Sequence, residues 1–216
     1  MIEDGLTAVR FAVDKLGLPL ERIALVGQSL GTAVTFGVAE RLASEQPPAE
    51  LGAVISIAGF SEMHGLLLNY RAGGLVPILS PLSSYQKLQT FFTRYIHERW
   101  DSIGRLGDLV RNSPNLNLVL IHAKHDIEIP HGHSEALFAR AANAAQKTLG
   151  GEDLTVGDVL KDRVETKYGN ESELAVWPVE KSNGRRISRW LVEFGGHNQV
   201  VGSAGTSVIV AKALGL

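Results

Sequence analysis

Four short runs of apolar residues, separated by stretches of helical periodicity, constrain the fold of this chain most strongly. Strands buried on both faces of a sheet appear as short apolar runs, and parallel strands need long, usually helical, crossovers. The pattern therefore predicts an α/β fold with a mostly parallel sheet flanked by helices. The last run alternates in part with polar residues and is expected nearer an edge. The expected strands are Arg22–Val26, Gly52–Ala58, Leu116–His122 and Ile187–Phe194. The expected helices cover residues 2–16, 30–43, 134–148 and 200–214.

The length of 216 residues fits one domain, which we expect to span residues 1–216. One segment, residues 60–115, interrupts the alternation and is rich in Leu, Phe, Tyr and Pro. Insertions of this length are often functional, which predicts a helical cap or lid over a site, with a purely structural insertion as the alternative. A second insertion, residues 150–185, is polar and carries no recognisable chemistry.

Composition excludes several classes of function. The net charge of −2 and the lack of a basic stripe argue against a nucleic-acid partner. The chain has no cysteine, which excludes disulfides, iron–sulfur clusters and thiolate zinc sites, and we predict no cofactor. No apolar run is long enough to span a membrane, and acidic Glu3 and Asp4 do not suit a signal peptide. The chain as written is expected to be soluble, with compartment and oligomeric state open.

The segment Gly27–Gly31 matches the pattern G-x-S-x-G, directly between an expected strand and an expected helix. That setting places a serine on a strained turn, so that its hydroxyl stands clear of the backbone. Both glycines are expected because side chains there would collide as strand and helix close together. We predict Ser29 as a nucleophile and the backbone N–H of Leu30 as an oxyanion donor at the helix start. The alternative is a phosphate loop or a plain turn, although neither common phosphate motif is present.

A serine nucleophile needs a general base and an acceptor that orients the base. In this setting the partners follow in the order serine, acid, histidine, each after a strand. His197 follows the fourth apolar run behind two glycines, and Asp126 follows the third. We therefore predict His197 as base and Asp126 as the orienting acid. Read singly, His197 could be a surface residue and Asp126 a helix cap; Glu128, and less so Asp101, compete as the acid.

Four further histidines surround Asp126 in the sequence. Their spacings include H-x-x-H and H-x-H, which occur in zinc sites, but H-E-x-x-H is absent. We expect a polar rim around the acid rather than a metal site. The four residues are His122, His125, His131 and His133.

These motifs together resemble the α/β hydrolases, and more narrowly fungal relatives of the monoacylglycerol and lysophosphatidylserine lipases. The resemblance implies an esterase or lipase that forms an acyl-enzyme on Ser29, and the apolar cap favours lipid-like acyl esters as small-molecule substrates. The segments that carry it are Gly27–Gly31, Ile121–Asp126 with Pro130, Gly195–Asn198, Ala58–Ser61 and Leu68–Pro77.

The chain departs from this family at its start. The family has about eight strands, and the nucleophile follows the fifth, whereas here it follows the first. We therefore expect only the last four strands, a truncated frame, a bare apolar edge at Arg22–Val26 and no loop for the second oxyanion donor. Family members often carry an N-terminal membrane anchor, so membrane contact through the cap or such an anchor stays open. The alternatives are a catalytically weak fragment that binds a partner through the open edge, and a serine peptidase.

Overall fold

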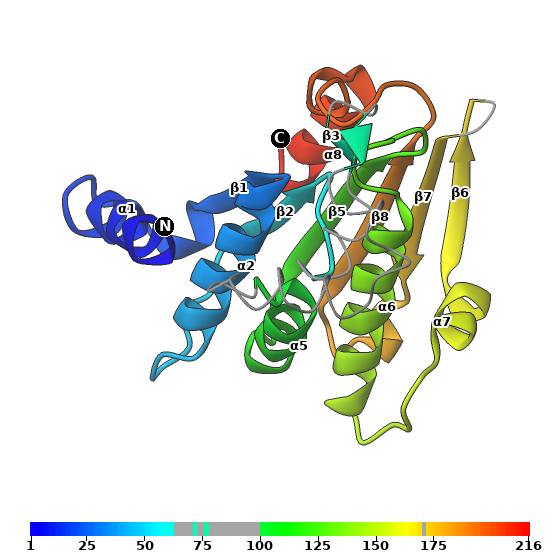
Figure 1. Ribbon diagram of the computed structural model, residues 1–216. Helices are drawn as coiled ribbons and strands as arrows, with labels where there is room; N and C mark the ends of the chain where they lie inside the picture. The colour runs from blue at the N-terminus through cyan, green and yellow to red at the C-terminus, as the bar shows by residue number, and fades with distance from the viewer. Residues whose placement is uncertain (63–70, 73–75, 78–99, 170–171) are drawn as a thin grey trace, which may run out of the picture.

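A single six-stranded sheet with helices on both faces organises the computed structural model, which describes residues 1–62, 71–72, 76–77, 100–169 and 172–216 (Figure 1). The strand order is β1-β2-β5-β8-β7-β6. The first four strands in this order are parallel, and β7 and β6 add to them antiparallel. The fold is therefore the expected mixed α/β type with a mostly parallel sheet. The strands of this sheet are β1 (Ala24–Gln28), β2 (Ala53–Ile57), β5 (Asn117–Ala123), β6 (Val164–Tyr168), β7 (Ser172–Trp177) and β8 (Arg186–Val192).

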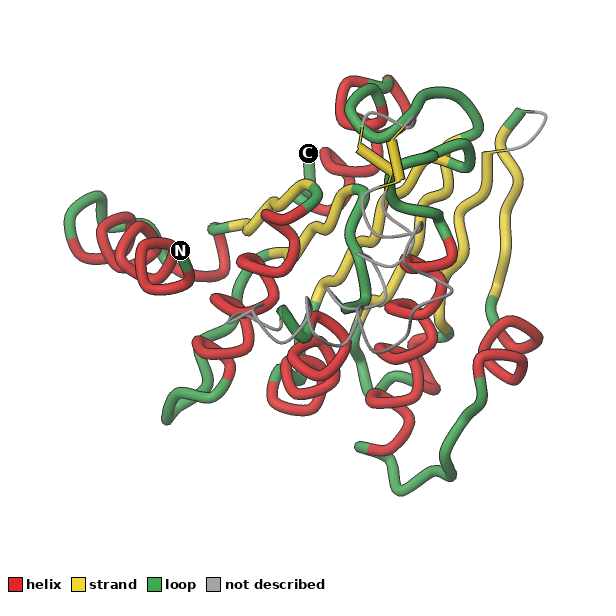
Figure 2. The backbone as a smooth tube through the Cα atoms, viewed as in Figure 1, coloured by secondary structure: helices red, strands yellow, loops and turns green. Residues whose placement is uncertain are grey.

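The helices form two layers, as the coloured tube of Figure 2 also shows. On one face α2, α5 and α6 lie side by side, and on the other face α8 packs against β5 and β8. Helix α1 packs on α2 through Leu6 and Val9, beside the β1 edge. The helices are α1 (Ile2–Asp14), α2 (Leu30–Ala43), α5 (Ser102–Asn112), α6 (Gly132–Lys147), α7 (Val156–Asp162) and α8 (Ala204–Ala213). Short 3-10 turns are η1 (Leu20–Arg22), η3 (Val179–Lys181) and η4 (Val200–Gly202).

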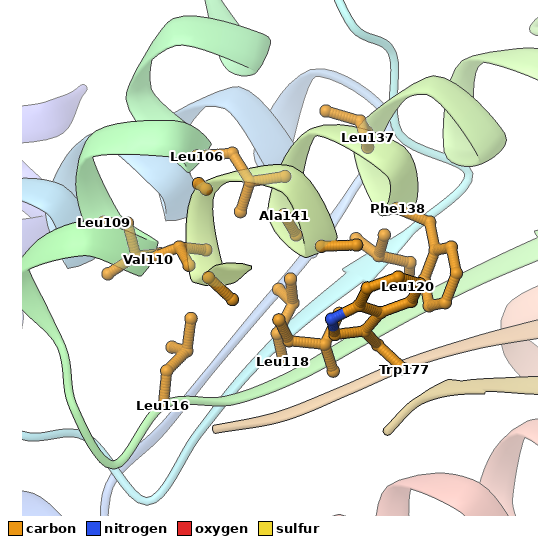
Figure 3. Close-up of a cluster of buried hydrophobic side chains, with 14 of the residues drawn as sticks. Leu106, Leu109, Val110, Leu116, Leu118, Leu120, Leu137, Phe138, Ala141 and Trp177 are labelled. Atoms are coloured by element: carbon orange, nitrogen blue, oxygen red, sulfur yellow. The ribbon is translucent and has the colours of Figure 1, made fainter. Parts of the chain in front are cut away.

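The main core lies between the sheet and the layer of α2, α5 and α6. Figure 3 shows Leu118 and Leu120 of β5 and Trp177 of β7 beneath Leu106 of α5 and Phe138 of α6. Every residue of β2 and β5 is buried, which is the burial expected of central parallel strands. This core fixes the carboxyl ends of β1, β2, β5 and β8 along one edge of the sheet.

Two features of the sheet differ from the expectation. The polar insertion of residues 150–185 forms α7, β6 and β7, and β6 is exposed along its whole length. An exposed strand carries no buried apolar run, so the sequence pattern did not reveal it. As a consequence β8 lies inside the sheet, between β5 and β7, and the prediction that this strand is nearer an edge was wrong.

The expected bare edge is found at β1, which is the outermost strand of the described sheet, with Val26 53% exposed. Of the expected cap, α5 belongs to the helical layer and is in the core, while β3 (Arg71–Ala72) and β4 (Val76–Pro77) form a two-stranded ladder. The other residues of the expected cap, 63–70, 73–75 and 78–99, lie outside the described residues, so the cap stays a prediction. In the part of the chain that is described, no helix is long and apolar enough to cross a membrane.

Candidate active site

The turn between β1 and α2 holds Ser29 in a strained conformation. Its φ of 52° and ψ of −122° lie outside the regions that a side chain ordinarily allows. The surrounding backbone maintains it, since the Ser29 N–H donates to the Ile57 carbonyl at 3.0 Å. The Ser29 carbonyl in turn accepts from the N–H of Thr32 at 3.0 Å and from its hydroxyl at 2.6 Å. The turn therefore has the strained geometry that the G-x-S-x-G motif predicts.

The two glycines of the motif differ in their surroundings. A Cβ at Gly27 would lie 2.4 Å from the Gly31 carbonyl oxygen and 2.5 Å from Thr35 Oγ1, so only glycine fits there. A Cβ at Gly31 would meet no described atom within 4 Å. The prediction that both positions exclude a side chain was therefore right for Gly27 and wrong for Gly31. The cause is directional, because the helix presents the Gly31 carbonyl, and not its Cα, to the strand.

Asp126 lies in the loop after β5 and is buried. The described groups that contact its carboxylate are all hydrogen-bond donors. Its Oδ1 accepts the backbone N–H groups of Glu128 and Ile129, each at 2.9 Å. Its Oδ2 lies 2.8 Å from His197 Nδ1 and 3.4 Å from His122 Nε2. A carboxylate with this many donors is held in one orientation and favoured in its ionised form.

The charge of Asp126 follows from competing effects. Burial alone would raise its pKa, but the hydrogen bonds from His122 and His197, with that from the Ile129 N–H, lower the pKa far below the usual value of 3.8. His197 responds in the opposite sense. The hydrogen bond to Asp126 raises the pKa of His197 above 6.5, and this outweighs the burial of the ring, which lowers it. The pair is thus arranged to stabilise an imidazolium beside a carboxylate.

His197 is only 7% exposed and is carried by the loop that follows β8. Gly195 turns this loop with a φ of 105°, a value that favours glycine, as the two glycines of the sequence predict. The loop is joined to the turn that carries Ser29, because the side-chain amide of Gln28 donates to the His197 carbonyl at 3.1 Å. Ser29 follows Gln28 directly, so the Ser29 turn and the His197 loop are joined at the carboxyl ends of the parallel strands.

Ser29, Asp126 and His197 therefore come from the carboxyl ends of three parallel strands, β1, β5 and β8. The structure joins His197 to Asp126 directly, whereas the described contacts include no hydrogen bond between the Ser29 hydroxyl and the His197 ring. Such bonds are often long before substrate binds. Leu30 is the first residue of α2, and its N–H has no acceptor within the helix.

The competing acids have other contacts. Glu128 contributes its backbone N–H to Asp126, and its charge raises the pKa of His197 less than Asp126 does. Asp101 caps α5, because its Oδ1 accepts the N–H of Gly104 at 2.8 Å. Asp126 is thus the carboxylate that contacts the His197 ring. Its catalytic role, with those of Ser29, Leu30 and His197, stays a prediction.

The four histidines that surround Asp126 in the sequence occupy different environments. His125 is exposed, while His122 is fully buried and its Nε2 lies 2.8 Å from the Ile129 carbonyl oxygen. His131 is partly buried, and His133 Nδ1 lies 3.0 Å from Ser61 Oγ. Within the described part of the chain, no three His, Cys, Asp or Glu side chains are grouped so as to hold a metal ion.

The contact of His122 with Asp126 is of the kind that the expected polar rim includes, whereas the contacts of His122 with the Ile129 carbonyl and of Ser61 with His133 were not predicted from the sequence. His122 supports both the acid and its loop, and Ser61 binds a histidine of another element. A signal exists for His122, since a histidine within a run of buried apolar residues must find a partner. Ser61 lies 72 positions from His133, and no local pattern indicates their contact.

No protein-family model matches this sequence, and no curated protein matches it. Among solved structures, the chain is similar to an acylaminoacyl peptidase of Pyrococcus horikoshii, with a TM-score of 0.49 and 16% identity over 96% of this chain and 25% of that one. It is also similar to a monoacylglycerol lipase of Paleococcus ferrophilus, with a TM-score of 0.44 and 16% identity over 99% of this chain and 75% of that one. A puromycin-hydrolyzing peptidase of Mycobacterium tuberculosis matches with a TM-score of 0.43 and 16% identity, over 67% of this chain and 20% of that one.

This chain thus spans a quarter of the length of the Pyrococcus peptidase. Likeness at these identities and TM-scores says nothing of a substrate. The function has to follow from the chemistry of the site itself.

Proposed function

We propose that this chain is a serine hydrolase of the α/β-hydrolase type, which cleaves carboxylic esters through an acyl-enzyme on Ser29. One observation carries the proposal. A buried histidine, 2.8 Å from a buried ionised carboxylate, lies at the same sheet edge as a serine in a strained strand-to-helix turn. The strained turn costs folding free energy, and a histidine oriented by an ionised carboxylate beside such a serine suits nucleophilic catalysis.

In the proposed first step, the Ser29 hydroxyl attacks the ester carbonyl carbon while His197 Nε2 takes the hydroxyl proton. The carbonyl oxygen becomes an oxyanion, which accepts a hydrogen bond from the Leu30 N–H. Asp126 holds the proton on Nδ1, leaving Nε2 free as the base. The imidazolium then gives its proton to the leaving alcohol oxygen as the bond from carbon to that oxygen breaks.

In the second step water replaces the alcohol. His197 removes a proton from the water as its oxygen attacks the acyl carbon of the acyl-enzyme. The bond between that carbon and Ser29 Oγ breaks, the oxygen regains a proton from His197, and a carboxylic acid leaves. The original Ser29 proton leaves on the alcohol and a proton from water replaces it, so Ser29 and His197 regain their starting protonation states and the cycle needs no cofactor.

Lipid-like acyl esters are the finer part of this proposal. Their support is the apolar sequence of residues 60–115, most of which lies outside the described residues. An amide substrate would use the same residues, so a peptidase differs only in the leaving group. A panel of monoacylglycerol, lysophospholipid, short p-nitrophenyl ester and peptide amide substrates would separate these classes.

A fluorophosphonate probe tests the nucleophile directly, because it reacts with an activated serine. We expect covalent labelling of the wild-type chain, loss of labelling in Ser29→Ala, and full labelling in Ser44→Ala, a serine that is exposed at the end of α2. Circular dichroism would show that the variants are folded. Absence of labelling in a folded wild-type sample would contradict the hydrolase proposal and favour a binding module. Labelling that persists in Ser29→Ala would assign the nucleophile to another residue.

A further inference from the structure

We propose that His133, oriented by Ser61, is a specificity-determining residue that donates a hydrogen bond to an ether or hydroxyl oxygen on the alcohol part of the ester. This inference rests on the hydrolase function proposed above and adds a site for the leaving group. It concerns a pocket beside the acid loop, lined among the described residues by Pro130, Gly132, His133 and Ala136. The pocket has a volume of about 310 Å³. Among its described lining residues, His133 is the one whose side chain can donate a hydrogen bond.

The contacts of His133 Nδ1 determine where the His133 ring carries its proton. The backbone N–H of Ser61 points to His133 Nδ1 at 3.4 Å, and the Ser61 hydroxyl lies 3.0 Å from the same atom. An N–H can only donate, so Nδ1 must be the acceptor with a bare lone pair. The neutral ring therefore carries its proton on Nε2, and Nε2–H is the donor that remains for a ligand.

Hydrogen bonds to other elements hold Ser61 and His133 in place. Ser61 lies on the loop that leaves β2, and its carbonyl accepts the N–H of Ile103 from α5 at 2.9 Å. His133 is in the first turn of α6, where its N–H donates to the Pro130 carbonyl at 3.0 Å. The pair is thus held by two helices and a strand end. A donor held in place before binding loses little entropy when a ligand arrives.

The surroundings of the His133 ring favour its neutral form. Burial lowers the pKa of His133, the neighbouring His122 lowers it further, and Glu62 and Asp126 act in the opposite direction. At neutral pH the ring is thus an uncharged donor. Such a donor suits an uncharged oxygen, because a neutral ring offers an anion no counter-charge and the other described lining residues of the pocket are apolar.

The alcohol part of the ester is assigned to this pocket from the position of His197. His197 must deliver its proton to the leaving oxygen, so the alcohol lies on the histidine side of the carbonyl and the oxyanion on the other. Asp126, which orients His197, accepts from Ile129 N–H, and Pro130 of the pocket follows Ile129 directly. Ile129 also packs with Phe60 and with Ala33, which lies near the start of α2 just after Ser29, and the charge of Asp126 acts on His133. We therefore assign the leaving group to this pocket.

The test compares two esters of one acid that differ in a single atom. In 2-methoxyethyl butanoate an ether oxygen stands where n-butyl butanoate has a methylene group. We expect the wild-type chain to prefer the methoxyethyl ester in kcat/KM by about threefold to tenfold, the range of one neutral hydrogen bond. His133→Leu should abolish this preference. His133→Gln, whose amide nitrogen can replace Nε2, should restore part of it.

Ser61 provides a second and milder variant. Ser61→Ala removes the hydroxyl, but the backbone N–H at this position still donates to Nδ1, so the donor tautomer is kept and the ester preference should fall by less than about half. Ser61→Thr, which retains a hydroxyl, should keep the preference. The matched control is His125→Leu, a histidine of the same loop that is exposed, and its ester ratio should equal that of the wild type.

The outcomes are distinguishable. If neither ester is hydrolysed by wild-type protein and the fluorophosphonate probe does not label it, the hydrolase proposal fails and this one with it. If hydrolysis occurs but folded His133→Leu keeps the wild-type ester ratio, only the His133 inference is overturned. Nitrogen-15 NMR of the histidine rings gives a readout without substrate. A proton found on Nδ1 of His133 would also overturn it.

Discussion

Replacement of Asp126 by asparagine tests the assignment of the orienting acid, and the structure predicts why this small change is severe. Oδ1 of Asp126 accepts two backbone N–H groups, from Glu128 and Ile129, each at 2.9 Å. Only an oxygen can accept them, so the asparagine oxygen must take the place of Oδ1. The amide NH₂ then faces His197, where the carboxylate oxygen had been.

The consequence is a change of tautomer. The asparagine NH₂ can only donate, so His197 Nδ1 has to accept and its proton moves to Nε2. A ring protonated on Nε2 cannot take the proton of Ser29. We expect kcat for Asp126→Asn to fall by about 10⁴, the loss found for a wrong tautomer, which corresponds to about 5 kcal/mol in the barrier.

Glu128→Gln is the matched control because it also removes one carboxylate of the same loop. Glu128 acts on His197 through its charge alone, in the same direction as Asp126. We expect kcat within about threefold of the wild type for this variant, since a charge without a hydrogen bond to the ring is worth little.

The pH profile of kcat/KM gives the sign of the effect. A general base works in its neutral form, so activity rises with pH through the pKa of His197, which Asp126 raises above 6.5. Loss of either carboxylate lowers that pKa, so in Glu128→Gln the rising limb should move to lower pH at nearly unchanged maximal rate.

The assay is steady-state hydrolysis of a p-nitrophenyl ester across this pH range, with folding checked by circular dichroism. If Asp126→Asn kept more than about a tenth of the wild-type kcat, the tautomer reasoning would be refuted. If Glu128→Gln were the more damaging variant, the orienting acid would be Glu128.

Two further predictions concern the framework of the site. Gly27→Ala should lower the free energy of unfolding by about 2 kcal/mol or more, because the new Cβ would lie 2.4 Å from the Gly31 carbonyl oxygen. Gly31→Ala should leave the free energy of unfolding unchanged or raise it, because a Cβ there meets no described atom within 4 Å. Urea titrations of both variants measure the difference. Arg185→Met should lower the free energy of unfolding by about 2–4 kcal/mol in the same measurement. Buried Arg185 donates to the Val110 carbonyl at 2.7 Å and to Thr148 Oγ1 at 3.1 Å, and the variant loses both hydrogen bonds. A loss under about 0.5 kcal/mol would mean that these bonds only replace hydrogen bonds to water.

The elements around the nucleophile could be predicted closely because local signals agree there. The helix after the motif was expected at residues 30–43, and α2 runs from Leu30 to Ala43. The strands β2 and β5 lie within one residue of the expected ranges, since both are buried over their full lengths and show as apolar runs. The order of serine, acid and histidine along the chain follows from the same runs, because each proposed catalytic residue lies in the turn or loop after one of them.

The remaining strands could not be predicted from such runs. β6 pairs with β7, and β7 with β8, through backbone hydrogen bonds that polar residues form as well as apolar ones. Only the position of Trp177 and Ala175 against α6 buries part of β7. A strand that is held mainly by pairing with its neighbour, and not by burial of its own face, shows little hydrophobic pattern in a single sequence.

The acid loop shows why the site itself is harder to predict than the fold. Asp126 Oδ1 is occupied by the backbone of its own loop, and its Oδ2 by His197 and His122, so one carboxylate sets both the shape of the loop and the position of the proton on the His197 ring. The loop then ends at Ile129, whose carbonyl lies 2.8 Å from His122 Nε2, and at Pro130 beside the pocket of His133. Changes to this carboxylate should therefore alter substrate preference as well as rate, a coupling that no spacing of residues along the chain reveals.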